Sequence, residues 1–361
     1  MTHWRPTAPL VTLEQRAILL ARARRFFADG GVLEVDTPVV VNSPVTDIHI
    51  HSAQVNLGPA AEHGYFLHTS PEYAMKRLLA AGSGDIYQIC HVVRGFERGR
   101  LHNAEFTLIE WYRLGFTLDD LMSEVDALVR ALLGPVATGR VSERITYREA
   151  FLRELQLDPF TASMAELQEA AAKLGFNGAG TSSSTATPGS TATLSSNSAA
   201  APGRDSNTAR GRDSGHSADR GPSRDELLDL LMGATVGPRL GTNALTFVHA
   251  YPATQAALAR LDPNDSRAAL RFELYCDGVE LANGFNELAS ATEQRARFNQ
   301  DNADRARMGL PVHPPDEFLL AALEAGLPEC SGVALGFDRT VMLATGAKTI
   351  DEVLAFPTER A

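Results

Sequence analysis

Apolar residues recur at helical spacing near the start of the chain. Residues 13–29, LEQRAILLARARRFFAD, place Leu19, Ala23, Phe26 and Phe27 on one face, with arginines mostly on the other. A helix with such a stripe buries its apolar side against a core and turns its charged side to water. The pattern therefore predicts an amphipathic helix, which ends at the two glycines that follow it.

Alternating patterns predict the strands. Residues 32–41, VLEVDTPVVV, alternate between aliphatic and acidic positions, which predicts a strand that ends near Pro38. Residues 86–94 and 105–115 are also strand-like, and the charged turn 95–104 between them predicts an antiparallel hairpin with a long loop. Further strands are predicted in residues 271–288, around a turn at Asp277–Gly278, and from residue 330, where a strand leads through glycine into a helix.

Other segments carry helix signals. In residues 67–82, LHTSPEYAMKRLLAAG, Ser70 can cap a helix and Pro71 suits its first position. Residues 117–134 predict another capped amphipathic helix, and residues 291–309 predict a polar helix. Helices and antiparallel strands thus mix along the whole chain, which indicates the α+β class.

Composition narrows the class of protein. The chain has 361 residues, 44% of them hydrophobic, and a net charge of −11. No apolar run approaches the ~20 residues of a membrane helix, and the N-terminus lacks a signal pattern. Cys90, Cys276 and Cys330 lie far apart, which argues against a zinc site or a disulfide framework and favours the reducing cytoplasm. An acidic surface repels nucleic acid except at a local basic patch.

Residues 178–223 contain almost no large apolar side chain. Such a segment cannot bury enough surface to offset its chain entropy. We expect a disordered surface insertion within a single domain that spans residues 1–361, because the residues on both sides of it contribute to one candidate site.

The stretch GVELANGFNEL, residues 278–288, carries polar groups among apolar ones. Asn283, Phe285 and Glu287 alternate, so on a strand they face the same side. Buried carboxylates require a cation, and an aromatic ring beside an amide and a carboxylate suits an aliphatic ammonium. The same pattern also suits a strand with one solvated face.

Other segments add groups of the same kind. Glu110 and Tyr112 share one strand face, and Glu72 lies in the first turn of a predicted helix. Three carboxylates and a tyrosine hydroxyl could together surround a small diamine.

Phosphate-binding signals occur at two places. The hairpin loop carries Arg94 and His102, and Arg339 follows glycines at the start of a helix; both arginines could bind phosphate, although each segment could also be an ordinary turn. Glu273 and Glu280 flank a turn in adjacent strands, and two carboxylates suit Mg²⁺ carrying polyphosphate.

The order of four segments, FFADGGVLEVDTP, RGFERGRLHNAEFTLIEWY, ELANGFNEL and GVALGFDR, resembles motifs one, two and three of class II aminoacyl-tRNA synthetases. The chain is most similar to the lysyl-tRNA synthetase catalytic core. It begins almost at motif one, which leaves no room for the N-terminal anticodon-binding barrel. In this it resembles the elongation factor P–lysine lysyltransferase family.

The resemblance implies a class II fold, an antiparallel sheet flanked by helices that pairs as a homodimer through motif one near Pro38. It implies ATP and Mg²⁺ as cofactors, lysine or β-lysine as substrate, and elongation factor P, not tRNA, as acceptor. The implied substrate contacts are Ser70, Pro71, Glu72, Glu110, Tyr112, Asn283, Phe285, Glu287 and Ala334. The implied ATP contacts are Arg94, Phe96, Glu97, His102, Asn103, Phe106, Glu280, Leu281, Gly336 and Arg339. Arg94 and Arg339 would be catalytic, and Glu273 and Glu280 would hold the metal.

The chain departs from the family pattern in motif two. The family usually has Arg-x-Glu, whereas Phe96 occupies the glutamate position and the carboxylate comes one residue later, at Glu97. Neighbouring strand residues face opposite sides, so either the loop is rearranged and Glu97 substitutes, or the contact is missing.

A second difference concerns Ala334. Lysyl-tRNA synthetases usually have glycine there, whereas the protein lysyltransferases resemble this chain in having alanine. An added methyl group would favour a β-amino over an α-amino substrate.

Two further functions remain compatible with these residues. One is a compact lysyl-tRNA ligase-like enzyme, against which the acidic charge counts. The other is a non-catalytic regulatory paralogue, which Phe96 favours and the intact Arg94, Glu280 and Arg339 oppose.

Overall fold

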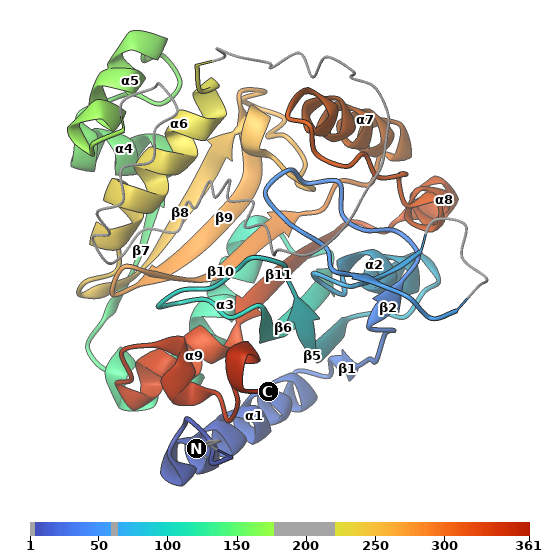
Figure 1. The fold of residues 1–361 in the computed structure, drawn as a ribbon, viewed down its shortest axis with the longest axis vertical. Coiled ribbons are helices and arrows are strands. Elements are labelled where there is room, and N and C mark those ends of the chain that lie inside the picture. The colour runs from blue at the N-terminus through green and yellow to red at the C-terminus, as the bar shows by residue number, and fades with distance from the viewer. Residues whose placement is uncertain (1–3, 59–63, 177–220) are drawn as a thin grey trace, which may run out of the picture.

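The computed structural model describes residues 4–58, 64–176 and 221–361. In this part of the chain an eight-stranded sheet has the order β1-β5-β6-β11-β10-β9-β8-β7 (Figure 1). All neighbouring strands are antiparallel except the edge pairs β1–β5 and β7–β8. The strands are β1 Leu33–Glu34, β5 Ile86–Val93, β6 Glu105–Leu114, β7 Val141–Thr146, β8 Ala244–Pro252, β9 Ala268–Cys276, β10 Val279–Asn286 and β11 Cys330–Gly336. The predicted α+β class, with a largely antiparallel sheet, is confirmed.

Helices pack around this sheet. They are α1 Leu10–Asp29, α2 Glu72–Ala80, α3 Leu118–Leu133, α4 Tyr147–Leu155, α5 Met164–Lys173, α6 Arg224–Leu231, α7 Ala291–Arg307, α8 Glu317–Gly326 and α9 Phe337–Thr345. Buried side chains of α1, α3 and α9 form the main core with one face of the sheet, and Val333 and Leu335 of β11 belong to it. Helices α4, α5 and α6 gather at the β7–β8 edge around a second core (Figure 1). The helices predicted at 13–29, 117–134 and 291–309 are confirmed.

The strand predicted from residue 32 to near Pro38 is shorter than predicted. Only Leu33–Glu34 forms β1, while Val40–Val41 forms β2 of a separate three-stranded sheet with β3, Gln54–Val55, and β4, Tyr65–Leu67. The N–H of Thr37 donates to the side chain of Gln88, 3.1 Å away, and Pro38 has no N–H to give to a ladder. The chain therefore leaves the large sheet at this point.

Local turn chemistry sets two other boundaries. Asp277 and Gly278, at φ 50° and 72°, form the tight turn between β9 and β10, as predicted. Helix α2 begins at Glu72, one residue later than predicted, and Pro71 precedes it. Ser70 still accepts a hydrogen bond from the start of this helix, because the N–H of Glu72 donates to its Oγ at 3.0 Å.

The predicted insertion lies mainly outside the described residues. Its last part, residues 221–223, is described, and Ser223 is the N-cap of α6, where its side chain accepts from the Glu226 N–H. Ser223, which the prediction placed in the disordered insertion, therefore belongs to a folded element. Within the described ranges, no helix is both long and apolar enough to cross a membrane.

Candidate active site

The pairing register assembles the candidate site on the sheet face opposite the main core. Glu110 of β6 lies opposite Ala334 of β11, Ala334 opposite Asn283 of β10, and Asn283 opposite Glu273 of β9. Directly paired residues point to the same face of a sheet. A second row joins Tyr112, Gly332, Phe285 and Arg271. Site residues predicted from distant segments thus share one surface.

Strand β11 supplies the floor of this surface. Gly332, Ala334 and Gly336 alternate with the core residues Val333 and Leu335, so three small residues face the site. A Cβ on Gly332 would lie 2.3 Å from Cε1 of Tyr112 and 2.6 Å from Oε1 of Glu287. Glycine is therefore needed at 332 to bring the tyrosine and the glutamate together.

We call the group Glu72, Glu110, Tyr112 and Glu287 the ammonium pocket. The Tyr112 hydroxyl donates to Glu110 Oε1 at 2.8 Å, and the Ser70 hydroxyl donates to Glu110 Oε2 at 2.7 Å. Glu287 is only 3% exposed, and neither of its oxygens accepts a hydrogen bond among the described residues; Oε2 has an ion pair, described below, and Oε1 has none. The predicted carboxylates are thus brought together, and one buried oxygen remains free for a donor.

Lys76, which our sequence reasoning missed, lies beside this pocket. Its Nζ is 2.6 Å from Glu72 Oε1 and 2.7 Å from Glu287 Oε2, and the residue is 1% exposed. Glu72 and Lys76 lie four residues apart on α2, so they share a helix face. That spacing was the signal that could have identified Lys76.

Burial changes the acidity of these groups. Burial and then the neighbouring Glu72 raise the pKa of Glu110 to about 8. Burial raises the pKa of Glu287 to about 7, against the opposing effect of Lys76. Burial alone would lower the pKa of Lys76, but Glu287 and Glu72 together raise it. Near neutral pH the pocket therefore holds a fixed cation and carboxyl groups that a second cation would help to ionise.

Arg271 was also missed, although it precedes Glu273 by two residues on the same strand face. Its Nε donates to Asn283 Oδ1 at 3.2 Å, and its guanidinium lies 4.4 Å from the ring centre of Tyr251 and 6.0 Å from that of Phe285. Arg271 thus orients the Asn283 amide and covers part of Phe285. Phe285 is half-buried, and its role in covering the methylene groups of a substrate stays a prediction.

Two arginines mark the other end of the site. Arg94 lies 5.2 Å from the ring centre of Phe106 and donates to the Thr69 carbonyl at 3.2 Å. Arg339 donates to the Glu280 carbonyl at 2.9 Å and to Nε2 of His102. Burial, Arg339 and Arg94 lower the pKa of His102 to about 3, so this histidine stays neutral and accepts. The arrangement offers two cations for phosphate groups.

The unusual motif-two loop has a distinct backbone. Phe96 adopts φ 63°, is 86% exposed and contacts the ring of His51 edge-on. A left-handed conformation is strained for a bulky residue. Glu97 lies 3.9 Å from Arg94. This geometry favours the first of the two alternatives, a rearranged loop in which Glu97 substitutes for the missing glutamate.

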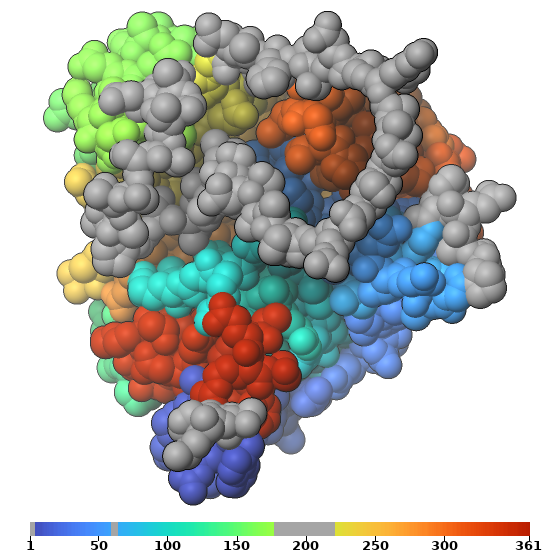
Figure 2. All heavy atoms as spheres, in the orientation of Figure 1, coloured from blue at the N-terminus to red at the C-terminus, as the bar shows by residue number. Residues whose placement is uncertain are grey.

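Asn103 and Leu281, two of the predicted ATP contacts, have no side-chain group free to bind a ligand through charge. Asn103 donates to the Glu105 carbonyl and accepts from the Thr358 N–H, while Leu281 is buried in the core. The C-terminal segment (red) lies against the motif-two loop (teal) in Figure 2, held by Arg98–Asp351 at 2.7 Å. Both ends of that loop are therefore tied down.

The predicted metal ligands, Glu273 and Glu280, lie close enough to influence each other. Burial and then Glu273 raise the pKa of Glu280. Tyr275 donates to Glu273 Oε2 at 2.6 Å, and Glu280 lies 3.6 Å from Arg339. No cluster of three or more metal-ligating side chains occurs in the described ranges. Two carboxylates suit a Mg²⁺ ion that takes its other ligands from phosphate and water.

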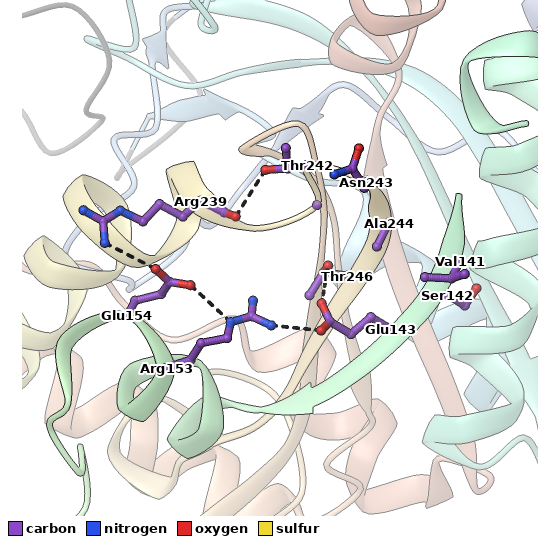
Figure 3. A pocket seen from close by; sticks show the side chains of 11 residues that line it. Val141, Ser142, Glu143, Arg153, Glu154, Arg239, Thr242, Asn243, Ala244 and Thr246 are labelled. Atoms are coloured by element: carbon purple, nitrogen blue, oxygen red, sulfur yellow. Dashed lines mark hydrogen bonds and ion pairs between the residues drawn. The ribbon is translucent and has the colours of Figure 1, made fainter. Parts of the chain in front are cut away.

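A separate cavity of about 460 Å³ lies at the β7–β8 edge (Figure 3). Its charged side chains pair with one another: Arg153 with Glu143 at 2.9 Å, and Arg239 with Glu154 at 3.3 Å. None of the site residues predicted from sequence lines it. The candidate chemistry therefore belongs to the sheet face that carries Glu110, Ala334 and Asn283, and not to this cavity.

Comparison with known proteins agrees with this arrangement. Residues 3–360 match the family model described as tRNA synthetases class II (D, K and N). Proteins named elongation factor P–(R)-β-lysine ligase are similar over nearly their whole length. Those of Klebsiella pneumoniae and Vibrio vulnificus are 46% and 47% identical, with 99% and 98% of this chain and 98% of each relative covered. The relative from Proteus mirabilis is 46% identical over 100% of this chain and 99% of its own length. The chain belongs to the class II tRNA synthetase family of the D, K and N type.

Proposed function

We propose that this protein is an ATP-dependent ligase that activates (R)-β-lysine, or lysine, as an adenylate and transfers it to a lysine side chain of elongation factor P. The observation that carries the proposal is the ammonium pocket, in which the buried carboxyl groups of Glu110 and Glu287 lie close enough to interact with each other and with Glu72. Such a pocket suits a small molecule with amino groups. The names of relatives about 46% identical support the same substrate and acceptor.

The residues of the candidate site suggest how the amino acid is activated. The pocket holds the amino groups, so that the substrate carboxylate lies toward Arg94. That carboxylate attacks the α-phosphorus of ATP in line, and pyrophosphate leaves. Arg94 and Arg339 offset the negative charge that develops, and neutral His102 orients Arg339. Mg²⁺ held by Glu273 and Glu280 would neutralise charge on the outgoing phosphates. The amine of the acceptor then displaces AMP from the mixed anhydride.

We further propose that the protein works in the cytoplasm as a homodimer paired through motif one, and that residues 178 to about 220 form a dispensable insertion. The acidic net charge of −11 disfavours tRNA as the acceptor.

The decisive experiment has two stages. Lysine-dependent pyrophosphate release, measured with α-lysine, both β-lysine isomers and ornithine, tests activation; no release with any of them would leave the non-catalytic alternative. Transfer of labelled amino acid is then compared among elongation factor P, its variant without the acceptor lysine, and lysine tRNA. Label on the intact factor alone supports the proposal, and label on the tRNA alone supports the compact tRNA ligase.

A further inference from the structure

We propose that Lys76 is a positioning residue of the ammonium pocket, which holds Glu72 and Glu287 aimed so that each can receive an amino group of a diamino acid. The inference rests on the proposed function, since it assigns a role within the same site. Two independent observations carry it: a buried lysine that bridges two carboxylates of the pocket, and a buried carboxylate oxygen that this bridge leaves without a partner.

Lys76 bridges two carboxylates of the pocket. The Nζ atom of Lys76 contacts one oxygen of Glu72 and one oxygen of Glu287, at 2.6 Å and 2.7 Å. Each carboxylate has two oxygens, so the bridge engages half of each group. Oε1 of Glu287 is the buried oxygen without an ion pair, and it lies over Gly332, 2.6 Å from where a Cβ on that glycine would be. The lysine thus orients the carboxylate and leaves its other oxygen available to the substrate.

Lys76 also brings a positive charge to the carboxylates of the pocket. Two carboxylates close together in a buried site repel one another, and one of them would take up a proton. A protonated carboxyl group binds an ammonium poorly. Glu72 on its own helix, Glu287 after β10 and Cys330 on β11 interact with this cation. Glu110 and Tyr112 on β6 interact with the same two carboxylates. A permanent cation among them favours the ionised carboxylates before the substrate arrives.

The cation at position 76 is a lysine and not an arginine. The chain has three lysines among its 33 lysine and arginine residues, so arginine is its usual basic residue. Lys76 is nevertheless lysine at a fully buried position. A compact ammonium can contact carboxylates from two elements without reaching past them, whereas a planar guanidinium tends to bind one carboxylate in a fork. The position therefore suits an ammonium that shares its donors.

The test uses Lys76→Met, which keeps the unbranched chain and removes the charge. Lys173→Met is the matched control, because Lys173 also pairs with a carboxylate four residues away, Glu169 at 3.1 Å, but is largely exposed and remote on α5. Pyrophosphate exchange between pH 6 and 9 gives the KM for the amino acid and for ATP. We expect Lys76→Met to raise the KM for the amino acid at least tenfold at pH 7, with the KM for ATP within about twofold. The loss should shrink as pH rises, because the carboxylates then ionise without help.

An equal rise in both KM values, or a loss of the same size at every pH, would overturn the proposal and make Lys76 a merely structural residue. If Lys76→Met fails to fold, a measurement on the wild-type protein tests the proposal instead. With ¹³C,¹⁵N-lysine labelling the protein gives three side-chain signals, which Lys173→Met and Lys348→Met assign. Unlabelled substrate should shift the Lys76 signal alone; no shift at saturation would also overturn the inference. Failure of the wild type to activate any lysine-like acid would instead refute the proposed function itself.

Discussion

Ala334 lies directly opposite Glu110 in the antiparallel pair of β11 and β6. Its methyl group therefore projects from the sheet face of the candidate site, between Glu110 and, on the other neighbouring strand, Asn283. Under the proposed function, a substrate whose amino groups enter the ammonium pocket would lie beside this methyl group. The position is thus suited to distinguish substrates by where their amino group is attached.

Replacing Ala334 with glycine should shift the choice between substrate isomers. Glycine opens space for an α-amino group, so Ala334→Gly should improve the use of α-lysine relative to β-lysine. One methyl group is worth about 1–3 kcal/mol in such a pocket, so the ratio of kcat/KM values should change by roughly ten- to two-hundredfold. Pyrophosphate exchange with each isomer, on both proteins, measures it. If both proteins prefer α-lysine to the same extent, position 334 does not select the substrate.

Glu287→Gln should weaken activation without changing the shape of the pocket. The amide cannot form the charge-assisted contact to an ammonium, which is worth about 1.5–3 kcal/mol, so kcat/KM for the amino acid should fall by about one to two orders of magnitude. Glu154→Gln, in the cavity at the β7–β8 edge, is the matched control and should have no effect. An unchanged rate for Glu287→Gln at saturating ATP would place the substrate elsewhere.

The outcome for this site shows how far sequence reasoning reaches. Alternation on 283–287 and 110–112 correctly grouped side chains by face, because strand geometry has a fixed period. Lys76 and Arg271 were missed because each is a cation beside a carboxylate, a pattern that equally describes an exposed ion pair. Only tertiary packing reveals that Lys76 is buried. The early end of the strand that begins at Leu33 depended in the same way on a distant partner, Gln88, whose side chain accepts from the Thr37 N–H.

Glu97→Ala tests whether Glu97 has replaced the usual motif-two glutamate. Glu97 lies 3.9 Å from Arg94, another residue predicted to contact ATP. If it contributes to nucleotide binding, its loss should raise the KM for ATP about three- to tenfold and leave the KM for the amino acid unchanged, as removal of one modest polar contact costs about 0.5–1.5 kcal/mol. Steady-state kinetics for both substrates measure the two values. An unaltered KM for ATP would mean that the contact is missing in this chain.

Phe96→Gly is informative about the same loop. Phe96 adopts φ 63° and is 86% exposed, so its side chain contributes little packing while its backbone is strained. A left-handed conformation costs a non-glycine residue about 1–2 kcal/mol, so glycine should leave the free energy of unfolding unchanged or raise it by up to about 1 kcal/mol. Urea unfolding at fixed pH measures this difference. A clear destabilisation would show that the ring contact with His51 outweighs the backbone strain.

The pH dependence of lysine binding follows from the carboxyl groups of the ammonium pocket. The pKa values of Glu110, about 8, and of Glu287, about 7, lie above the ordinary value of 4.5. An arriving ammonium lowers both, because an opposite charge favours the ionised form. Binding should therefore release protons near neutral pH, and affinity should increase from pH 6 to pH 8. The substrate ε-amine, with a pKa of about 10.4, stays charged throughout this interval.

Stability of the free protein should change in the opposite direction. A carboxyl group whose folded pKa is raised stabilises the folded state fully below its unfolded pKa, and this contribution is lost as pH rises through the folded value. Between pH 5 and 8 the free protein should thus lose stability at Glu110 and Glu287, while lysine restores more of it at pH 8 than at pH 6. Calorimetric titration in two buffers of different ionisation enthalpy measures the released protons, and thermal unfolding with and without lysine measures the stabilisation. A heat of binding that is the same in both buffers, together with a larger Tm increase at pH 6, would show that these carboxyl groups do not receive the substrate.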